Sequence, residues 1–138
     1  MFSIPAHAFA VPIKIEAADI DQLNHVNNVV YFKWVQEVAT AHWESLTTPQ
    51  QRAQWLWVVR RHEIDYLRPT FAGDEVTAFT WVVPAEQPGS DRIIVFKNMK
   101  TDKVLTQVKT TWYLIDPASM RSKKIPDEVF ALFGISSI

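Results

Sequence analysis

The chain has 138 residues, of which 48% are hydrophobic and 21% charged, and its formal net charge is -1 at pH 7. This composition is typical of a globular protein and excludes an intrinsically disordered chain. A net charge so close to zero gives no indication of a nucleic-acid or membrane-surface role. Because the chain contains no cysteine, disulfides, a thiolate nucleophile and Cys-based metal sites are excluded.

The length favours a single domain over residues 1–138, and no internal repeat or linker divides it. No uninterrupted apolar run approaches the roughly 20 residues that span a bilayer, so membrane insertion is not expected. The first basic residue, Lys14, follows the apolar N-terminal segment, whereas a secretory signal has its positive charge in front. We therefore expect a soluble, unprocessed protein of the cytoplasm.

A first strand is expected over residues 9–16, followed by a polar segment and one long helix over residues 28–46. The helix has a clear 3.6-residue periodicity, with the opposite side polar. The residues of its apolar stripe are Tyr31, Trp34, Val35, Val38, Ala39, His42 and Leu46. Asn27 or Asn28 is expected to cap the helix, since its side-chain oxygen can accept a first-turn N–H.

The rest of the chain has the β-forming residues and turn signals of strands. Four more strands are expected, over residues 57–68, 76–83, 92–99 and 104–115. A short last helix over residues 127–133 ends at Gly134.

This order of elements predicts an α+β fold, because a single helix can cover only one face of a five-stranded sheet. We expect the long helix to lie across one face of a mostly antiparallel sheet that wraps around it. The other face, and an edge with Val58, Ile64 and Tyr66, would need a second subunit.

Residues 19–28, directly before the helix, are the most informative segment, because they combine two carboxylates, an imidazole and several carboxamides. A helix N-terminus offers free backbone N–H groups and a partial positive charge of roughly half a unit. Such an end stabilises an anion, or an oxygen that is becoming one. A carboxylate beside it therefore indicates acyl-group chemistry.

The segment has a recognisable pattern, Asp-x-Asp-x-x-x-His-Val-Asn-Asn-x-x-Tyr-x-x-Trp. Its defined positions are Asp19, Asp21, His25, Val26, Asn27, Asn28, Tyr31 and Trp34. The pattern resembles the helix-start motif of the hotdog-fold acyl thioesterases, in the branch of 4-hydroxybenzoyl-CoA, bacterial long-chain acyl-CoA and plant acyl-ACP thioesterases. Residues 63–69 and 73–75 resemble the family's second strand and following turn, so the resemblance covers about residues 11–126.

The resemblance implies a hotdog fold and a role for each motif residue. Asp21 would be the catalytic carboxylate, acting as a nucleophile or as a base for water. The backbone N–H of Asn28 would polarise the thioester carbonyl, and His25 would complete the catalytic set. The residues expected to contact the substrate are Asn24, Tyr31 and Trp34. Many acyl-CoA members carry Gly where this chain has Asn24, but Asn also adopts the left-handed conformation.

Each of these residues also has a purely structural interpretation. Asp21 can shape a turn by accepting local N–H groups, and we expect Asp19 to do so. His25 can fix the loop through backbone carbonyls, and His42, on the apolar stripe, is expected in the core or an interface. The six Trp residues are expected to be core or interface aromatics, with an acyl channel as the alternative. No spacing of Asp and His residues indicates a metal site, and no cofactor is expected.

The predicted function is hydrolysis of an acyl-CoA or acyl-ACP thioester by a homodimer, or by a homotetramer built as a dimer of dimers. Two alternatives stay open: a hotdog enoyl-thioester hydratase or dehydratase, and a non-catalytic module that binds acyl thioesters. The hydratase branch resembles an Asp and a His five residues apart with Pro between them. Here Asp21 and His25 are four residues apart without Pro, which favours the hydrolase.

Overall fold

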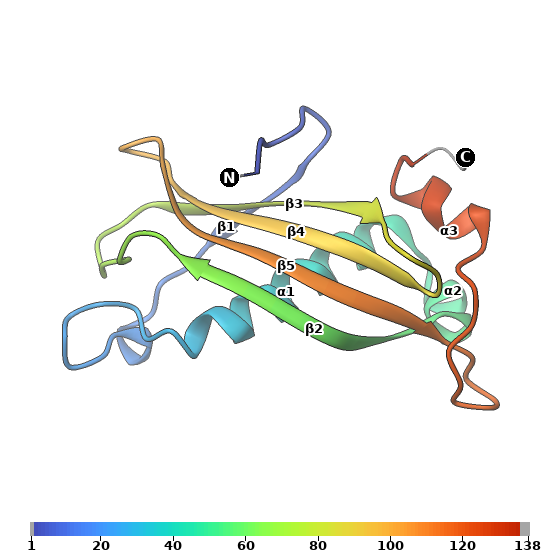
Figure 1. Cartoon of the computed structure of the whole chain (residues 1–138). Coiled ribbons are helices and arrows are strands. Elements are labelled where there is room, and N and C mark those ends of the chain that lie inside the picture. Colours follow the sequence, from blue (N-terminus) through green and yellow to red (C-terminus); the bar gives the residue numbers. More distant parts are fainter. Residues whose placement is uncertain (1, 136–138) are drawn as a thin grey trace.

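The computed structural model describes residues 2–135, which form one sheet and a long helix packed on it (Figure 1). In chain order the elements are β1 (Phe9–Ile13), a 3-10 helix (Ala17–Asp19), α1 (Val30–Leu46), α2 (Pro49–Gln54), β2 (Leu56–Tyr66), β3 (Val76–Pro84), β4 (Gly89–Asn98), β5 (Lys103–Ile115) and α3 (Asp127–Leu132). The sheet order is β1-β3-β4-β5-β2, and every neighbouring pair is antiparallel. The expected α+β architecture is therefore confirmed.

The helix α1 begins at Val30, two residues later than expected, because its first turn is tighter than an α-helix. The N–H groups of Val30 and Tyr31 donate to the carbonyl groups three residues earlier, those of Asn27 and Asn28. The side chain of Asn27 accepts the N–H of Val29 at 3.0 Å. The N-cap position of α1 is nevertheless Val29, without a side-chain cap, so the expected cap by Asn27 or Asn28 is wrong and Asn27 instead stabilises the turn before the helix.

Two short elements were not expected from the sequence. The predicted first strand ends at Ile13 instead of residue 16, since a 3-10 turn follows, in which the N–H of Glu16 donates to the Asp19 carboxylate at 2.9 Å. After α1, the extra helix α2 begins with a capping box in which the side chains of Thr48 and Gln51 accept each other's backbone N–H. The Thr-Pro-x-Gln sequence was the available signal for this helix.

The apolar stripe of α1 packs against one face of the sheet, as its periodicity predicted. Trp34, Val35 and Val38 are fully buried and contact Ile94 and Phe96 of the central strand β4. Burying each such side chain contributes roughly 1.5–3 kcal/mol to stability, so this contact fixes α1 on the sheet.

The opposite face of the sheet is partly covered by the chain itself. Trp81, Ile93 and Val95 are buried there, and Ile4 and Ala8 of the N-terminal segment pack against them. The expectation that this whole face needs a second subunit was therefore too broad.

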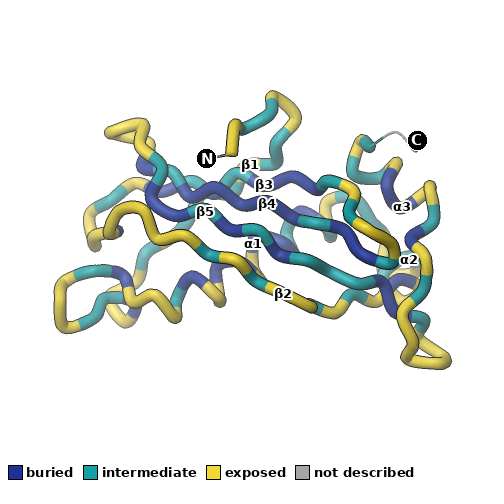
Figure 2. The backbone as a smooth tube through the Cα atoms, in the orientation of Figure 1, coloured by how far each residue is buried: buried dark blue, intermediate teal, exposed yellow. Residues whose placement is uncertain are grey.

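The strand β2 is an edge of the sheet, paired on one side with β5. Figure 2 shows much of its length exposed, in contrast to β3 and β4. Large apolar side chains remain exposed on β2 and directly after it, namely Leu56, Val58, Tyr66 and Leu67. An exposed edge of this length is able to pair with another chain.

A buried polar cluster joins α1 to the sheet near the C-terminal end of the helix. One nitrogen of Arg92, Nη1, lies 2.9 Å from Nδ1 of His42 and donates to the Thr80 hydroxyl at 2.9 Å. The His42 ring also stacks on Phe9, with ring centroids 4.8 Å apart. His42 is thus the core histidine that its place on the apolar stripe predicted.

The environment of His42 lowers its pKa from 6.5 to about 4, through burial first and the positive charge of Arg92 second. The ring is therefore neutral at pH 7, and its Nδ1 can accept the N–H of Arg92. Burial also lowers the pKa of Arg92 to about 9, which leaves this side chain charged at neutral pH.

We expect acid to destabilise the protein through His42. Between pH 6.5 and pH 4 the histidine binds a proton in the unfolded chain but not in the folded one, so the free energy of unfolding falls as the pH falls. The shift of the pKa from 6.5 to about 4 corresponds to on the order of 3 kcal/mol. Urea unfolding of the wild type and His42→Gln at pH 7 and pH 4.5 measures this loss. The wild type should lose about 2 to 3 kcal/mol more than the variant, and equal losses would contradict the assignment.

Candidate functional site

The polar segment before α1 forms a short closed loop. An isolated antiparallel bridge joins Ile20 to Val26, and inside it the N–H of Asp21 donates to the carbonyl oxygen of His25 at 2.8 Å. A turn from Asp21 to Asn24 closes the loop, with the Asn24 N–H donating to the Asp21 carbonyl at 3.1 Å. Asn24 has a φ of 64°, which is the left-handed conformation expected of it.

Two backbone hydrogen bonds fix this loop to the rest of the fold. The N–H of Val26 donates to the carbonyl oxygen of Thr70, between β2 and β3, at 2.7 Å, and the N–H of Asn27 donates to that of Asp19 at 2.9 Å. Asp19 is buried, and its carboxylate accepts the N–H of Glu16. The carboxylate of Asp19 therefore structures the loop, as expected from the sequence.

The carboxylate of Asp21 is half-buried, and its two oxygens differ in their hydrogen bonds. Its Oδ1 accepts the N–H of Leu23 at 2.9 Å and that of His25 at 3.2 Å. Its Oδ2 has no hydrogen-bond donor within residues 2–135. Asp21 thus shapes the turn with one oxygen and keeps the other for a ligand or water.

His25 packs through its ring, without a polar partner for either ring nitrogen among the described residues. The ring meets Phe71 edge to face, with centroids 5.0 Å apart. Its backbone, not its imidazole, makes the loop hydrogen bonds with Asp21. Both ring nitrogens are therefore free to exchange a proton or a hydrogen bond with a bound molecule.

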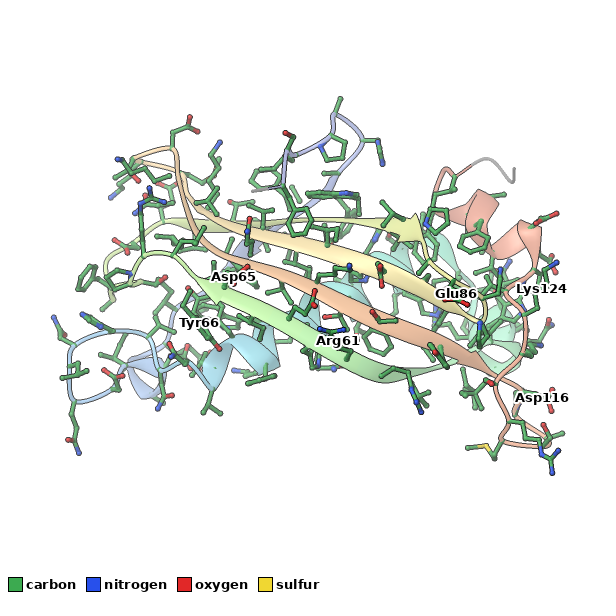
Figure 3. The ribbon with its side chains drawn as sticks, in the orientation of Figure 1. Arg61, Asp65, Tyr66, Glu86, Asp116 and Lys124 are labelled. Atoms are coloured by element: carbon green, nitrogen blue, oxygen red, sulfur yellow. The ribbon has the colours of Figure 1, made fainter. Side chains whose placement is uncertain are left out.

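Asn28 lies in the turn directly before α1, and its backbone N–H has no acceptor within the described part of the chain. The carbonyl oxygen of the same residue accepts the hydroxyl of Tyr66 at 3.2 Å and the N–H of Tyr31 at 3.2 Å. Figure 3 shows Tyr66, at the end of β2, next to the start of α1. This turn therefore presents an unused donor at the positive end of the helix.

These groups surround one cavity of about 330 Å³. It is lined by Asp21, Leu23, His25, Val26, Asn27, Asn28, Tyr31, Tyr66, Leu67, Arg68, Pro69 and Thr70. A carboxylate, an imidazole and a free N–H at a helix start therefore lie around the same space. This set can polarise a carbonyl, supply a nucleophile or base, and transfer a proton.

The structure brings four of the six predicted site residues to this cavity, namely Asp21, His25, Asn28 and Tyr31. Tyr31 is buried, its hydroxyl is hydrogen-bonded to Thr70, and burial raises the pKa of its phenol above the ordinary value. Asn24 and Trp34 are not among the lining residues. Asn24 forms the turn, and Trp34 lies in the core with 1% of its surface exposed.

Sequence reasoning did not assign the wall formed by residues 66–70 to the site. Tyr66 was expected as an edge residue, yet its hydroxyl holds the carbonyl of Asn28. Arg68 lines the cavity and donates to the carbonyl of Val104 at 2.6 Å. The available signal was the resemblance of residues 63–69 to the family's second strand, but only the hydrogen bond from β2 to the helix start shows what this segment does.

Residues 2–135 contain neither a recognisable metal site nor a membrane-spanning helix. Over this range no group of three or more His, Cys, Asp or Glu side chains is arranged to hold a metal ion. In the same range no helix is long and apolar enough to cross a membrane.

Comparison with known proteins identifies the family. A family model described as "Thioesterase-like superfamily" matches residues 15–133. A chloroplastic palmitoyl-acyl carrier protein thioesterase from Gossypium hirsutum is 30% identical over 104 residues, which are 69% of this chain and 25% of that protein. The chain spans about a quarter of the length of this curated relative.

Solved structures show the same fold. A 12:0-ACP thioesterase from Umbellularia californica superimposes with a TM-score of 0.80 at 23% identity, covering 99% of this chain and 57% of that one. A thioesterase from Thermus thermophilus, solved with coenzyme A and Zn, superimposes with a TM-score of 0.77 at 20% identity, covering 96% of this chain and 100% of that one. The expected hotdog fold is thereby confirmed.

Proposed function

The chain belongs to the thioesterase-like superfamily, and we propose that it hydrolyses an acyl thioester to a carboxylic acid and a thiol. The observation that carries the proposal is the pairing, around one cavity, of the unbonded Asn28 N–H with the Asp21 carboxylate. The carbonyl oxygen of the thioester becomes negative during attack, and a donor at a helix start stabilises that charge. This stabilisation requires an N–H that does not already donate to another acceptor.

Asp21 supplies the attacking group by one of two routes. Its Oδ2 attacks the carbonyl carbon and forms an acyl anhydride that water then hydrolyses, or it removes a proton from a water molecule that attacks directly. By either route the C–S bond breaks and the thiolate accepts a proton. His25, with both ring nitrogens free of protein partners in the described range, is the group that we assign to this proton transfer.

The substrate that we propose is an acyl-CoA or an acyl-ACP. The relative from Gossypium hirsutum is a palmitoyl-acyl carrier protein thioesterase, and the neighbour from Thermus thermophilus was solved with coenzyme A. Exposed apolar side chains near the cavity, among them Leu23, Leu67 and Phe71, offer contacts to the apolar parts of such a substrate. The compartment that we propose for the protein is the cytoplasm.

Two other functions are tested by the same assay. An enoyl-thioester hydratase would add water to an enoyl-CoA without releasing thiol, and a binding module would bind acyl-CoA without turnover. Absorbance detection of free thiol over a panel of acyl-CoA and acyl-ACP substrates separates all three.

Asp21→Asn should give a folded protein with at least a hundredfold lower turnover, the usual scale for losing one essential catalytic group. The amide oxygen can still accept the N–H groups of Leu23 and His25, so the turn is kept. An amide cannot act as a nucleophile or base as a carboxylate does. Thiol release and the melting temperature are measured together.

The matched control for this variant is Asp19→Asn, since Asp19 has a structural hydrogen bond and does not line the cavity. Its turnover should stay within a few-fold of the wild type. A loss below tenfold for Asp21→Asn, at an unchanged melting temperature, would move catalysis to another group.

Asn28→Pro should reduce turnover by roughly a hundredfold or more, the scale for losing one oxyanion donor. Proline removes the backbone N–H, and no hydrogen bond of the described residues uses this N–H in the turn before α1, so the fold should persist. Asn28→Ala keeps the N–H and should retain activity within a few-fold. Equal activities of the two variants would show that the donor lies elsewhere.

We propose that the active form is a homodimer, or a dimer of such dimers, with the free edge of β2 in the interface. The exposed apolar side chains on and after β2 support this proposal. Sedimentation at micromolar concentration should show a dimer or tetramer, and Val58→Lys on the edge should shift it toward monomer and lower the activity. Gln50→Lys, on exposed α2, is the charge-matched control and should change neither. An active monomeric wild type would overturn the proposal.

A further inference from the structure

A second cavity of about 310 Å³ lies near the opposite end of α1 from the Asp21 loop. Figure 1 shows α2 and α3 at this end of the molecule. The two cavities share no lining residue. Along α1, Tyr31 lines the first cavity and Gln36 the second, five positions or about 7.5 Å apart. The second cavity therefore has a lining of its own.

The walls of this cavity are largely aromatic. Trp43, Trp57 and Phe133 line it, with Trp55 and Trp112 completing the aromatic surface. Part of the aromatic set packs together, with the rings of Trp43 and Phe133 stacked at a centroid distance of 5.4 Å. Such walls favour a ligand with an apolar body.

The charged residues that line the cavity are both positive. They are Arg52 and Arg92, and no carboxylate is among the lining residues. Arg92 is only 4% exposed, yet it forms no ion pair with any carboxylate of the described residues. Its Nη1 donates to His42 and Thr80, while its Nε and Nη2 have no acceptor within residues 2–135. Burying a guanidinium whose N–H donors are open costs desolvation free energy unless an anion accepts hydrogen bonds from them.

A second buried donor in the same wall lacks a partner. The indole Nε1 of Trp112 is inaccessible and has no hydrogen-bond acceptor in the described part of the chain. Unsatisfied buried donors are uncommon in folded proteins and need an explanation. Because this nitrogen is inaccessible, a ligand in the cavity does not reach it, and of the two residues Arg92 alone supplies open donors to the cavity.

We propose that this cavity binds a small monocarboxylate with an apolar body. The carboxylate accepts from the open Nε and Nη2 donors of Arg92, which match its two oxygens. The apolar body lies against the aromatic walls. A cavity of about 310 Å³ is at the lower end of the roughly 300–1,000 Å³ of small-molecule pockets, so a short acid such as octanoate is a suitable size. The site lies outside the proposed catalytic cavity and does not depend on hydrolysis.

Tryptophan fluorescence of the full chain tests this proposal, because four Trp residues line the cavity. The titration uses octanoate at pH 7 and, as the neutral control of equal chain length, octan-1-ol. Octanoate should change the fluorescence saturably and bind at least tenfold more tightly than octan-1-ol, since a charged hydrogen bond is lost with the alcohol. Equal affinities, or no saturable change with octanoate, would overturn the proposal.

Variants then locate the binding. Arg92→Met keeps an unbranched side chain but removes the charge, and it should weaken octanoate at least tenfold while leaving octan-1-ol unchanged. If this variant does not fold, Arg92→Lys keeps the positive charge without the paired donors and should weaken octanoate by about tenfold. Asp21→Asn should bind octanoate as the wild type does. Octanoate binding that is lost in Asp21→Asn and kept in Arg92→Met or Arg92→Lys would place the acid in the other cavity and overturn the proposal.

Discussion

The apolar stripe of α1 packs against one face of the sheet, and both cavities lie along this contact. Trp34, Val35 and Val38 anchor the middle of the helix on β4, so its two ends are held at fixed places over the sheet. The N-terminal end meets the polar loop and the end of β2, and the C-terminal half meets the beginning of β4 and the segments α2 and α3. Because interiors are close-packed, a shift of the helix would disturb both cavities together.

The two cavities use opposite ways of stabilising negative charge. In the first, a backbone N–H before the helix start has no acceptor among residues 2–135, and the dipole of α1 adds to its effect. In the second, the positive charge of Arg92 is buried without a carboxylate partner in the same range. A backbone dipole suits a charge that develops only during a reaction, whereas a buried guanidinium suits a permanent anion.

The geometry of Asp21 is compatible with the structural and with the proposed catalytic interpretation at once. Its Oδ1 closes the turn through the N–H groups of Leu23 and His25, and its Oδ2 remains without a protein donor in the described residues. The turn holds the side chain at one place, which is what positioned catalysis needs. A turn-forming carboxylate can therefore be better placed to react than a freely rotating one.

The sequence by itself determined the class of fold, the five strands and the long helix, because these follow from local periodicity and turn residues. The sequence also indicated that Asp21 and His25 lie close together, because they belong to one segment of ten residues. It missed α2, whose capping box lies in only four residues, and it placed the start of α1 two residues early.

The tertiary structure alone decided the contacts between distant parts of the chain. Tyr66 reaches the carbonyl of Asn28 across 38 positions, and Arg92 reaches His42 across 50. Trp34 has the right spacing for a site residue, yet the packing of α1 buries it in the core. Periodicity records only which side of an element is apolar, whereas the register of the strands and the place of the helix on the sheet determine which side chains meet.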